Sequence, residues 1–153
     1  MDRNENLQTQ QEFIPCYSLT ELYDHERFQT PEKAGGYYYY FHNSGLQAQD
    51  VLYQQDTLTS VPRVFLNPNT LETDGTAALN AFEFSKSGKL FAYCISRSGS
   101  DWVTINLQDN QGNKLEDVIK WAKSPRVSFT HDDKGFFYGV SRRKKKMSRT
   151  RLR

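Results

Sequence analysis

Residues 84–93 read FSKSGKLFAY and residues 129–138 read FTHDDKGFFY, so one phrase occurs twice at a spacing of 45 residues. Each copy places an aromatic residue before a polar turn that contains glycine, and large apolar residues after that turn. A strand–turn–strand unit that returns every 40–50 residues or so is typical of the blades of a β-propeller. One blade cannot cover both of its own faces, so the repeat predicts a larger ring than 153 residues can supply.

Working outward from the repeat, short apolar and aromatic runs separated by polar, glycine-containing turns predict a series of antiparallel strands. We expect them at residues 37–41, 51–55, 63–66, 79–84, 90–95, 102–107, 127–129 and 136–140. The predicted fold class is therefore all-β: a partial β-propeller of about two and a half four-stranded antiparallel blades.

The chain divides into three predicted parts. Residues 1–35 form an N-terminal segment with a short helix, residues 36–140 form the partial propeller, and residues 141–153 form a basic, disordered tail. For the helix we expect Ser18 as the N-cap and Glu21 as its capping-box partner. The tail carries eight Lys or Arg residues at 142–153 and no acid, which leaves the rest of the chain with a net charge of −6.

Composition narrows the cellular setting and the kinds of partner. No apolar run is long enough to span a membrane, and the N-terminal residues lack the apolar stretch of a secretory signal. Cys16 and Cys94 are the two cysteines, too few for a disulfide framework, which favours a reducing, cytoplasmic location. The basic tail leaves a nuclear location open as an alternative.

Several segments together resemble the prolyl oligopeptidase family, in the order and at the spacing of that family. They are residues 19–23 (LTELY), 38–47 (YYYFHNSGLQ), 51–53 (VLY), 98–104 (SGSDWVT), 130–132 (THD) and 134–135 (KG). The similarity covers about residues 4–140 and identifies the chain with the end of the family's N-terminal segment and the first two and a half blades of its propeller.

The resemblance implies a parent activity and a role for the propeller. Members of the family are cytosolic serine endopeptidases that cleave short peptides after proline, and a seven-bladed propeller covers their α/β-hydrolase domain and excludes folded proteins. We therefore interpret the chain as a fragment that carries part of this substrate gate. In the family, an aromatic residue after a Lys helps to shape the substrate site. Ser124 replaces that aromatic residue in Lys123-Ser124-Pro125, so we transfer no substrate contact to this chain.

None of the 153 residues is assigned a catalytic, cofactor-binding or metal-ligating role. The sequence contains no Gly-x-Ser-x-Gly turn, and Ser98-Gly99-Ser100 has the wrong glycine spacing for one. The three histidines, His25, His42 and His131, lack the spacing of a metal site, and for His42 and His131 we predict hydrogen bonding in turns. We expect the chain alone to be inactive as a peptidase, and no cofactor is implied.

The aromatic and thiol side chains have structural interpretations that we prefer to functional ones. Tyr37 to Tyr40 could form a stacking platform for nucleic acid, but alternation along a strand puts only two on each face, which favours packing. We expect Trp102 to pack between blades and Asp101 to accept hydrogen bonds from turn amides. Cys94 is predicted to be a buried thiol within a strand, whereas Cys16 has no partner nearby.

Two alternative functions remain open beside the peptidase fragment. The chain is also consistent with a non-catalytic module that binds a protein partner through its open blade faces. A basic-tailed protein that contacts nucleic acid through residues 142–153 is less favoured, because a change of reading frame or a truncated gene copy also explains a tail unlike the family. Since open faces and unpaired strand edges promote association, we expect the isolated chain to be marginally stable or prone to aggregate.

Overall fold

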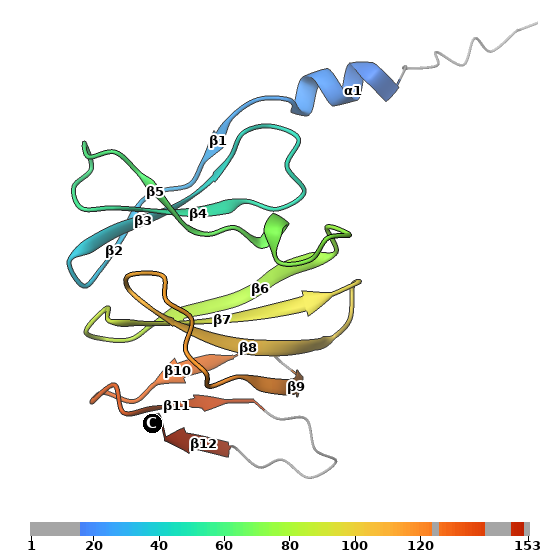
Figure 1. The fold of residues 1–153 in the computed structure, drawn as a ribbon. Helices are drawn as coiled ribbons and strands as arrows, with labels where there is room; N and C mark the ends of the chain where they lie inside the picture. Colours follow the sequence, from blue (N-terminus) through green and yellow to red (C-terminus); the bar gives the residue numbers. More distant parts are fainter. Residues whose placement is uncertain (1–15, 124–125, 140–147, 152–153) are drawn as a thin grey trace, which may run out of the picture.

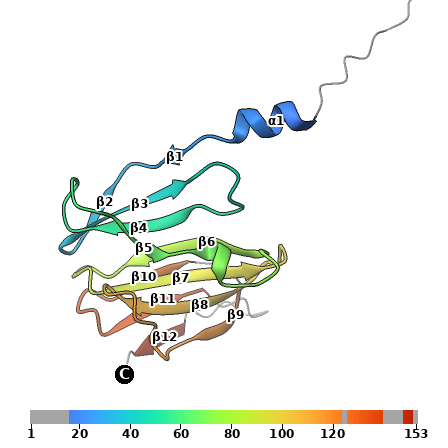
Figure 2. The same ribbon diagram turned by 45° about the horizontal axis from the view of Figure 1, so that its top comes forward.

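The computed structural model describes residues 16–123, 126–139 and 148–151, which form one short helix and three antiparallel sheets. The sheets lie above one another in chain order (Figure 1), and helix α1 (Cys16–Tyr23) projects away from the first sheet in both views (Figure 1 and Figure 2). The stack remains open, with no sheet returning to close it into a ring among the described residues. A partial propeller of antiparallel blades is therefore confirmed as the fold.

The first sheet contains five strands, in which β3 pairs with both β4 and the short strands β1 and β2, and β4 pairs with β5. Its strands are β1 (Arg27–Phe28), β2 (Glu32–Ala34), β3 (Tyr37–Asn43), β4 (Val51–Gln55) and β5 (Arg63–Leu66). The 3-10 turn η1 (Pro68–Thr70) leads from this sheet to the second one, and Asn67 caps it by accepting a hydrogen bond from the amide of Asn69.

The second sheet is a complete four-stranded meander in the order β6-β7-β8-β9. Its strands are β6 (Ala77–Phe84), β7 (Leu90–Arg97), β8 (Trp102–Asp109) and β9 (Ile119–Lys123). The third sheet follows with β10 (Val127–Phe129), β11 (Gly135–Tyr138) and β12 (Ser148–Arg151). Strand β10 lies beside β6, so the second and third sheets meet at their first strands, as neighbouring blades do around a propeller axis.

Two apolar layers hold the three sheets together, and β7 contributes to both. Because side chains alternate along a strand, Phe91, Tyr93 and Ile95 face the first sheet, whereas Ala92 and Cys94 face the third. The layer between the first and second sheets also contains Tyr39, Leu52, Phe65, Leu66 and Ala77. The layer between the second and third sheets also contains Val103, Ile105, Leu107, Ala122 and Phe136.

The repeated turns that decide the fold also contact one another across the sheets. The turn after β6 approaches the turn after β2 so closely that a Cβ on Gly88 would lie 2.2 Å from the backbone nitrogen of Gly35. The turn after β10 reaches the same β6–β7 turn through Asp133, whose carboxylate accepts hydrogen bonds from the amides of Lys86 and Ser87, each at 3.2 Å. The turns therefore form a continuous line of contacts at one end of the stack.

Several sequence predictions differ from the structure in detail. Helix α1 begins at Cys16, so Ser18 is its third residue and the prediction of Ser18 as N-cap is wrong. Strand β9 was not predicted at all. Strand β12 occupies Ser148–Arg151, where a disordered tail was expected, while the rest of 140–153 lies outside the described residues. The strands at 51–55, 63–66 and 127–129 have the predicted bounds.

The structure gives no support for a membrane span by a helix. Among residues 16–123, 126–139 and 148–151, no helix is both long and apolar enough to cross a bilayer.

Candidate binding surface on the second sheet

The described residues hold no group of side chains arranged for peptide hydrolysis or for metal binding. No cluster of three or more His, Cys, Asp or Glu side chains is present among them. The hydroxyl of Ser98 donates to Thr76 Oγ1 at 3.4 Å, and the hydroxyl of Ser100 accepts from the amide of Trp102 at 3.1 Å. These two serines therefore shape the β7–β8 turn, and neither contact involves a histidine that could activate a nucleophile.

A pair of exposed tryptophans is the most unusual surface feature of the second sheet. Trp102 begins β8 and is 40% exposed, and Trp121 lies within β9 and is 72% exposed. Their ring centroids are 6.0 Å apart and the ring planes meet at 72°, the edge-to-face arrangement that aromatic pairs prefer. Two large apolar rings are thus held in a fixed geometry while most of the Trp121 ring faces solvent.

The backbone of Trp121 is strained. The pairing of β8 with β9 shifts register between Val103 and Ile105, so that Lys120 and Trp121 together lie opposite Thr104 in a β-bulge. At this bulge Trp121 adopts φ 62°, a left-handed conformation that costs a bulky residue about 1–2 kcal/mol. Glycine is the residue ordinarily found at such a position, and a tryptophan occupies it here.

The two rings form one wall of a hollow of about 430 Å³ on the second sheet, which we call the tryptophan groove. It is lined by Trp102, Trp121, Val118, Lys120, Arg97 and Asn106, together with smaller residues of β7 and β8. The volume lies within the range of ordinary small-ligand sites. The groove lies on the face of the second sheet that carries Ile95. Ile95 also belongs to the apolar layer between the first and second sheets, whereas Trp102 and Trp121 lie outside that layer.

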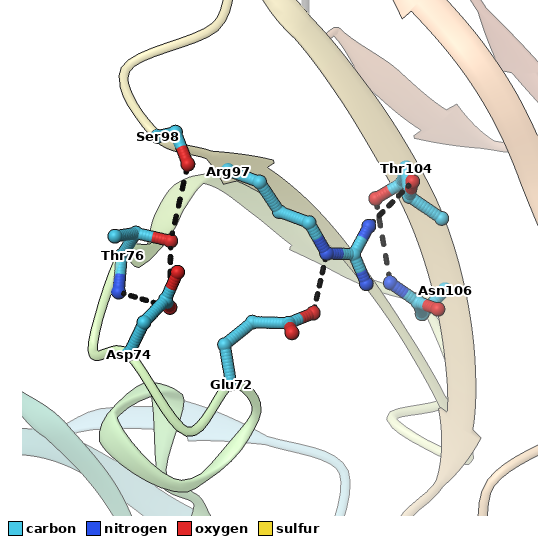
Figure 3. A network of polar contacts seen from close by, with 7 residues as sticks. All are labelled: Glu72, Asp74, Thr76, Arg97, Ser98, Thr104 and Asn106. Atoms are coloured by element: carbon cyan, nitrogen blue, oxygen red, sulfur yellow. Dashed lines mark hydrogen bonds and ion pairs between the residues drawn. The ribbon is translucent and has the colours of Figure 1, made fainter.

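Polar contacts hold Arg97, Thr104 and Asn106, which also line the groove (Figure 3). The Arg97 guanidinium binds the carboxylate of Glu72 through Nε and donates to Thr104 Oγ1 at 3.4 Å, and the Asn106 amide donates to the Thr104 carbonyl at 3.3 Å. Beside them, the backbone amide and the hydroxyl of Thr76 donate to Asp74, which lowers the pKa of that carboxyl. Arg97 is therefore held in place and its charge is already matched by Glu72.

Two lysines supply positive charge at the ring side of the groove. Lys123 Nζ lies 5.7 Å from the centre of the Trp102 ring, within cation–π range, and 4.0 Å from the exposed carboxylate of Asp101. Lys120 is exposed and lines the groove, and it makes no ion pair within the described part of the chain. A bound molecule would therefore meet apolar ring faces flanked by cationic groups.

The predictions for Asp101 and Trp102 are corrected by this geometry. Ser100, rather than Asp101, accepts the hydrogen bond from the amide of Trp102, and Asp101 instead faces Lys123. Trp102 does not pack between sheets, because it begins β8 at 40% exposure and its ring makes an edge-to-face contact with Trp121 of its own sheet. Sequence reasoning missed Trp121 because β9 has no copy of the repeated phrase, although Trp121 lies in an IKWAK run of strand-like composition.

The histidines make contacts other than the turn hydrogen bonds predicted for them. The ring of His131 lies 3.3 Å from Lys86 Nζ in the neighbouring sheet, whereas Thr130 and Asp132 hold its own turn. The ring of His42 stacks on Phe28 with centroids 4.3 Å apart, and its Nε2 is buried without a hydrogen-bond partner in the described chain. Both side chains therefore serve packing and contact between elements.

The remaining assignments concern buried side chains. Cys94 is fully buried and free, as predicted, and burial raises the pKa of its thiol to about 11. Tyr37 and Tyr39 pack in the layer against the second sheet, which confirms the packing interpretation for that pair. Tyr40 faces the other side of the first sheet and stacks on Tyr53. Ser124 and Pro125, where the family aromatic is absent, lie outside the described residues.

Comparison with families of known proteins gives one clear match. The model of the prolyl oligopeptidase N-terminal β-propeller domain matches residues 3–152. A prolyl endopeptidase of Elizabethkingia miricola is 39% identical over 121 residues, which cover 78% of this chain and 17% of that protein. The dual function macrocyclase-peptidase POPB of Amanita bisporigera is 34% identical over 137 residues, which cover 75% of this chain and 19% of that protein.

Solved structures agree with the sequence comparison. The apo form of prolyl oligopeptidase B from Galerina marginata superposes with a TM-score of 0.75 and 30% sequence identity, covering 89% of this chain and 24% of that one. The same protein bound to a 25mer macrocyclization substrate gives a TM-score of 0.74 at 29% identity. The chain thus spans about a fifth of the length of the proteins that it resembles.

Proposed function

Because the chain belongs to the prolyl oligopeptidase family, we propose that its three sheets are the opening blades of a propeller that gates a proline-specific serine endopeptidase. In this proposal the blades lie over the catalytic cleft and restrict it to short peptides. We assign no catalytic residue to the sheets themselves. Their contribution is the shape and rigidity of the gate, and the substrates are short proline-containing peptides.

The observation that carries the proposal is the open stack of sheets over the region that matches the family's propeller model. The outer face of the first sheet supports it further. Phe28, Tyr40 and Tyr53 lie on that face, with ring centroids 6.2 Å apart for Phe28 and Tyr40 and 5.7 Å apart for Tyr40 and Tyr53. A face of aromatic rings without a covering sheet is what a blade presents before its neighbour in the ring is added.

The proposal includes a cytoplasmic location. Its support is the sparing use of cysteine and the free, buried thiol of Cys94, a pattern common in reducing compartments. Binding of nucleic acid through the basic residues after 141 forms no part of the proposal. The described residues add no observation in favour of that alternative.

A chimera tests the gating role. The matched segment of the Elizabethkingia miricola prolyl endopeptidase is replaced by the corresponding residues of this chain. We expect the chimera to cleave a chromogenic Gly-Pro reporter peptide and to leave a folded, proline-containing protein intact. The 153-residue chain alone should leave the reporter uncleaved.

The parent enzyme and a parent that lacks the segment are the matched controls. The proposal is contradicted if the folded chimera cleaves the protein substrate as readily as the reporter. It is also contradicted if the parent without the segment discriminates between the two substrates as well as the intact parent does. Turnover by the 153-residue chain that a serine-reactive inhibitor abolishes would contradict the assignment of no catalytic residue.

A further inference from the structure

The strained tryptophan on the second sheet has no role in holding the sheets together. Trp121 lies at the outer edge of the sheet and contributes to neither apolar layer. It also keeps a left-handed backbone conformation that glycine would adopt without strain. Strained residues that persist without a packing benefit are concentrated at functional sites, so the ring itself calls for a functional explanation.

The ring pair has the geometry of a platform for proline. Trp102 and Trp121 present two ring surfaces at 72° to each other beside a hollow of about 430 Å³. Proline-rich segments adopt an extended left-handed helix without internal hydrogen bonds, and aromatic-lined grooves bind this shape at low entropic cost. Neither indole N–H donates a hydrogen bond within the described chain, so both are available to peptide carbonyl groups, which proline-rich segments leave unpaired.

The charges around the groove select the kind of peptide. Arg97 is matched by Glu72, whereas Lys120 has no counter-charge among the residues described, and Lys123 faces Asp101 at a distance of 4.0 Å. The unmatched charge beside the rings is therefore positive. A carboxylate adjacent to the prolines would complement it and would be favoured over a lysine at the same position.

The same charges disfavour a nucleic acid. Glu72 pairs with Arg97 and Asp101 lies beside Lys123, so Lys120 is the one cation of the groove lining without an ion pair among the described residues. A polyanion that approaches the groove would meet these carboxylates along its length, whereas a peptide with one or two acidic residues would place them only beside the lysines.

We propose that the tryptophan groove binds a peptide segment that contains proline together with an acidic residue. Trp102 and Trp121 hold the proline rings, and Lys120 pairs with the carboxylate. The groove would thereby retain the distal part of a longer proline-containing peptide on the surface of the gate. This inference takes its ligand class from the proposed function, but binding to the groove is measured separately from gating.

Fluorescence anisotropy of the 153-residue chain with a fluorescein-labelled peptide EPPPEPPP tests the proposal. Every residue that lines the groove lies within the described part of this chain. We expect saturable binding that weakens at least about tenfold in Trp121→Gly. Glycine removes the ring and suits the left-handed backbone, so this variant should keep the fold, which circular dichroism checks. Val61→Ala, at a site 91% exposed outside the groove, is the matched control and should bind as the unchanged chain does.

A charge exchange tests the role of Lys120. Lys120→Glu should weaken binding of EPPPEPPP and strengthen binding of KPPPKPPP, so that the preference between the two peptides is reversed. Equal binding by Trp121→Gly and the unchanged chain, equal binding of an EAAAEAAA peptide, or no saturation with EPPPEPPP would overturn the proposal. Preference for an oligothymidine over the peptide would overturn it as well. These binding assays use the 153-residue chain and not the chimera. A chimera that does not discriminate between the two substrates would contradict the gating role without affecting the binding results.

Discussion

The layer between the first and second sheets differs from the layer between the second and third, although β7 supplies side chains to both. Toward the first sheet, Phe91 and Tyr93 join an aromatic cluster that includes Tyr39 and Phe65. Toward the third sheet, Ala92 and Cys94 join small and aliphatic side chains, and Phe136 is the one aromatic ring fully buried there among the described residues. One strand therefore presents two faces of different chemistry.

The contacts between turns differ in the same way. Gly35 and Gly88 bring the first and second sheets together through backbone alone, and no side chain fits between them. The second and third sheets are joined at the same end by the carboxylate of Asp133 on two amides. Polar contacts join the first and second sheets as well, since Gln108 donates to the Phe65 carbonyl at 3.3 Å and Gln54 donates to the Asn110 carbonyl at 2.9 Å. Small side chains bury less apolar area each, so the difference between the two layers lies in their apolar contribution.

The largest expected effect follows from removing the centre of the aromatic layer. Phe91 is fully buried and its ring lies 4.6 Å from that of Phe84 and 5.3 Å from that of Phe65. Phe91→Ala should lower the free energy of unfolding by about 3–5 kcal/mol, because it leaves a cavity among rings that cannot close around it. Urea unfolding followed by tryptophan fluorescence measures this loss.

Phe28→Ala is the matched control for that experiment, since Phe28 is 62% exposed on the outer face of the first sheet. We expect it to change the free energy of unfolding by less than about 1 kcal/mol. Hydrogen exchange tests whether the two layers are independent. Phe91→Ala should increase the amide exchange rates in β3 and β7 more than those in β11. Equal loss of protection in all three strands would show that the two layers act as one.

The next effect concerns the backbone contact between the first two sheets. Gly88 and Gly75 both have positive φ, at 69° and 68°, so alanine introduces similar backbone strain at either position. A Cβ at Gly75 meets nothing within 4 Å, whereas one at Gly88 meets the backbone of Gly35. Gly88→Ala should therefore destabilise the chain by about 1–3 kcal/mol more than Gly75→Ala, the cost of overpacking at a fixed contact.

Thermal unfolding of the two alanine variants side by side measures this difference. If both variants unfold at the same temperature, the close approach of the turns after β2 and β6 does not contribute to stability. The first and second sheets would then be held by their apolar layer and by polar contacts such as that of Gln108 with the Phe65 carbonyl.

The sequence predicted the parts of this architecture that local pattern encodes. Short apolar and aromatic runs between polar turns, together with the repeated turn phrase, are sufficient to indicate stacked antiparallel strands. Strand β9 could not be found in this way, because a bulge at Trp121 breaks the two-residue period. The position of Ser18 inside helix α1 shows the usual weakness of predicted helix ends.

Less of the candidate site than of the fold could be predicted from the sequence. Pairing of Trp102 with Trp121 depends on the register of β8 with β9, which is set by hydrogen bonding across the sheet. The partners of Asp133 and His131 lie about 45 residues away in the neighbouring sheet, so only the stacking of the sheets brings them together. Contacts between repeats are invisible to a pattern that describes each repeat by itself.

The smallest expected effect follows from removing the Asp133 carboxylate, which forms the polar contact between the turns of the second and third sheets. Asp133 has φ 54°, so glycine at this position keeps the backbone conformation and removes only the carboxylate. Asp133→Gly should cost about 1 kcal/mol, the net value of hydrogen bonds to two exposed amides. Its specific signature is faster hydrogen exchange at the amides of Lys86 and Ser87, since Asp133 is their acceptor.

Asp132→Ala, which removes the acceptor oxygens, is the control for that last comparison. Asp132 accepts from the hydroxyl of Thr130 and the amide of Lys134 within its own turn, so its replacement should loosen the β10–β11 turn without reaching the second sheet. Unchanged exchange at Lys86 and Ser87 in Asp133→Gly would mean that the carboxylate does not join the sheets. The second and third sheets would then be held by their apolar side chains and by the contact of His131 with Lys86. The contrast between the two layers would reduce to the size of the side chains that β7 presents on each face.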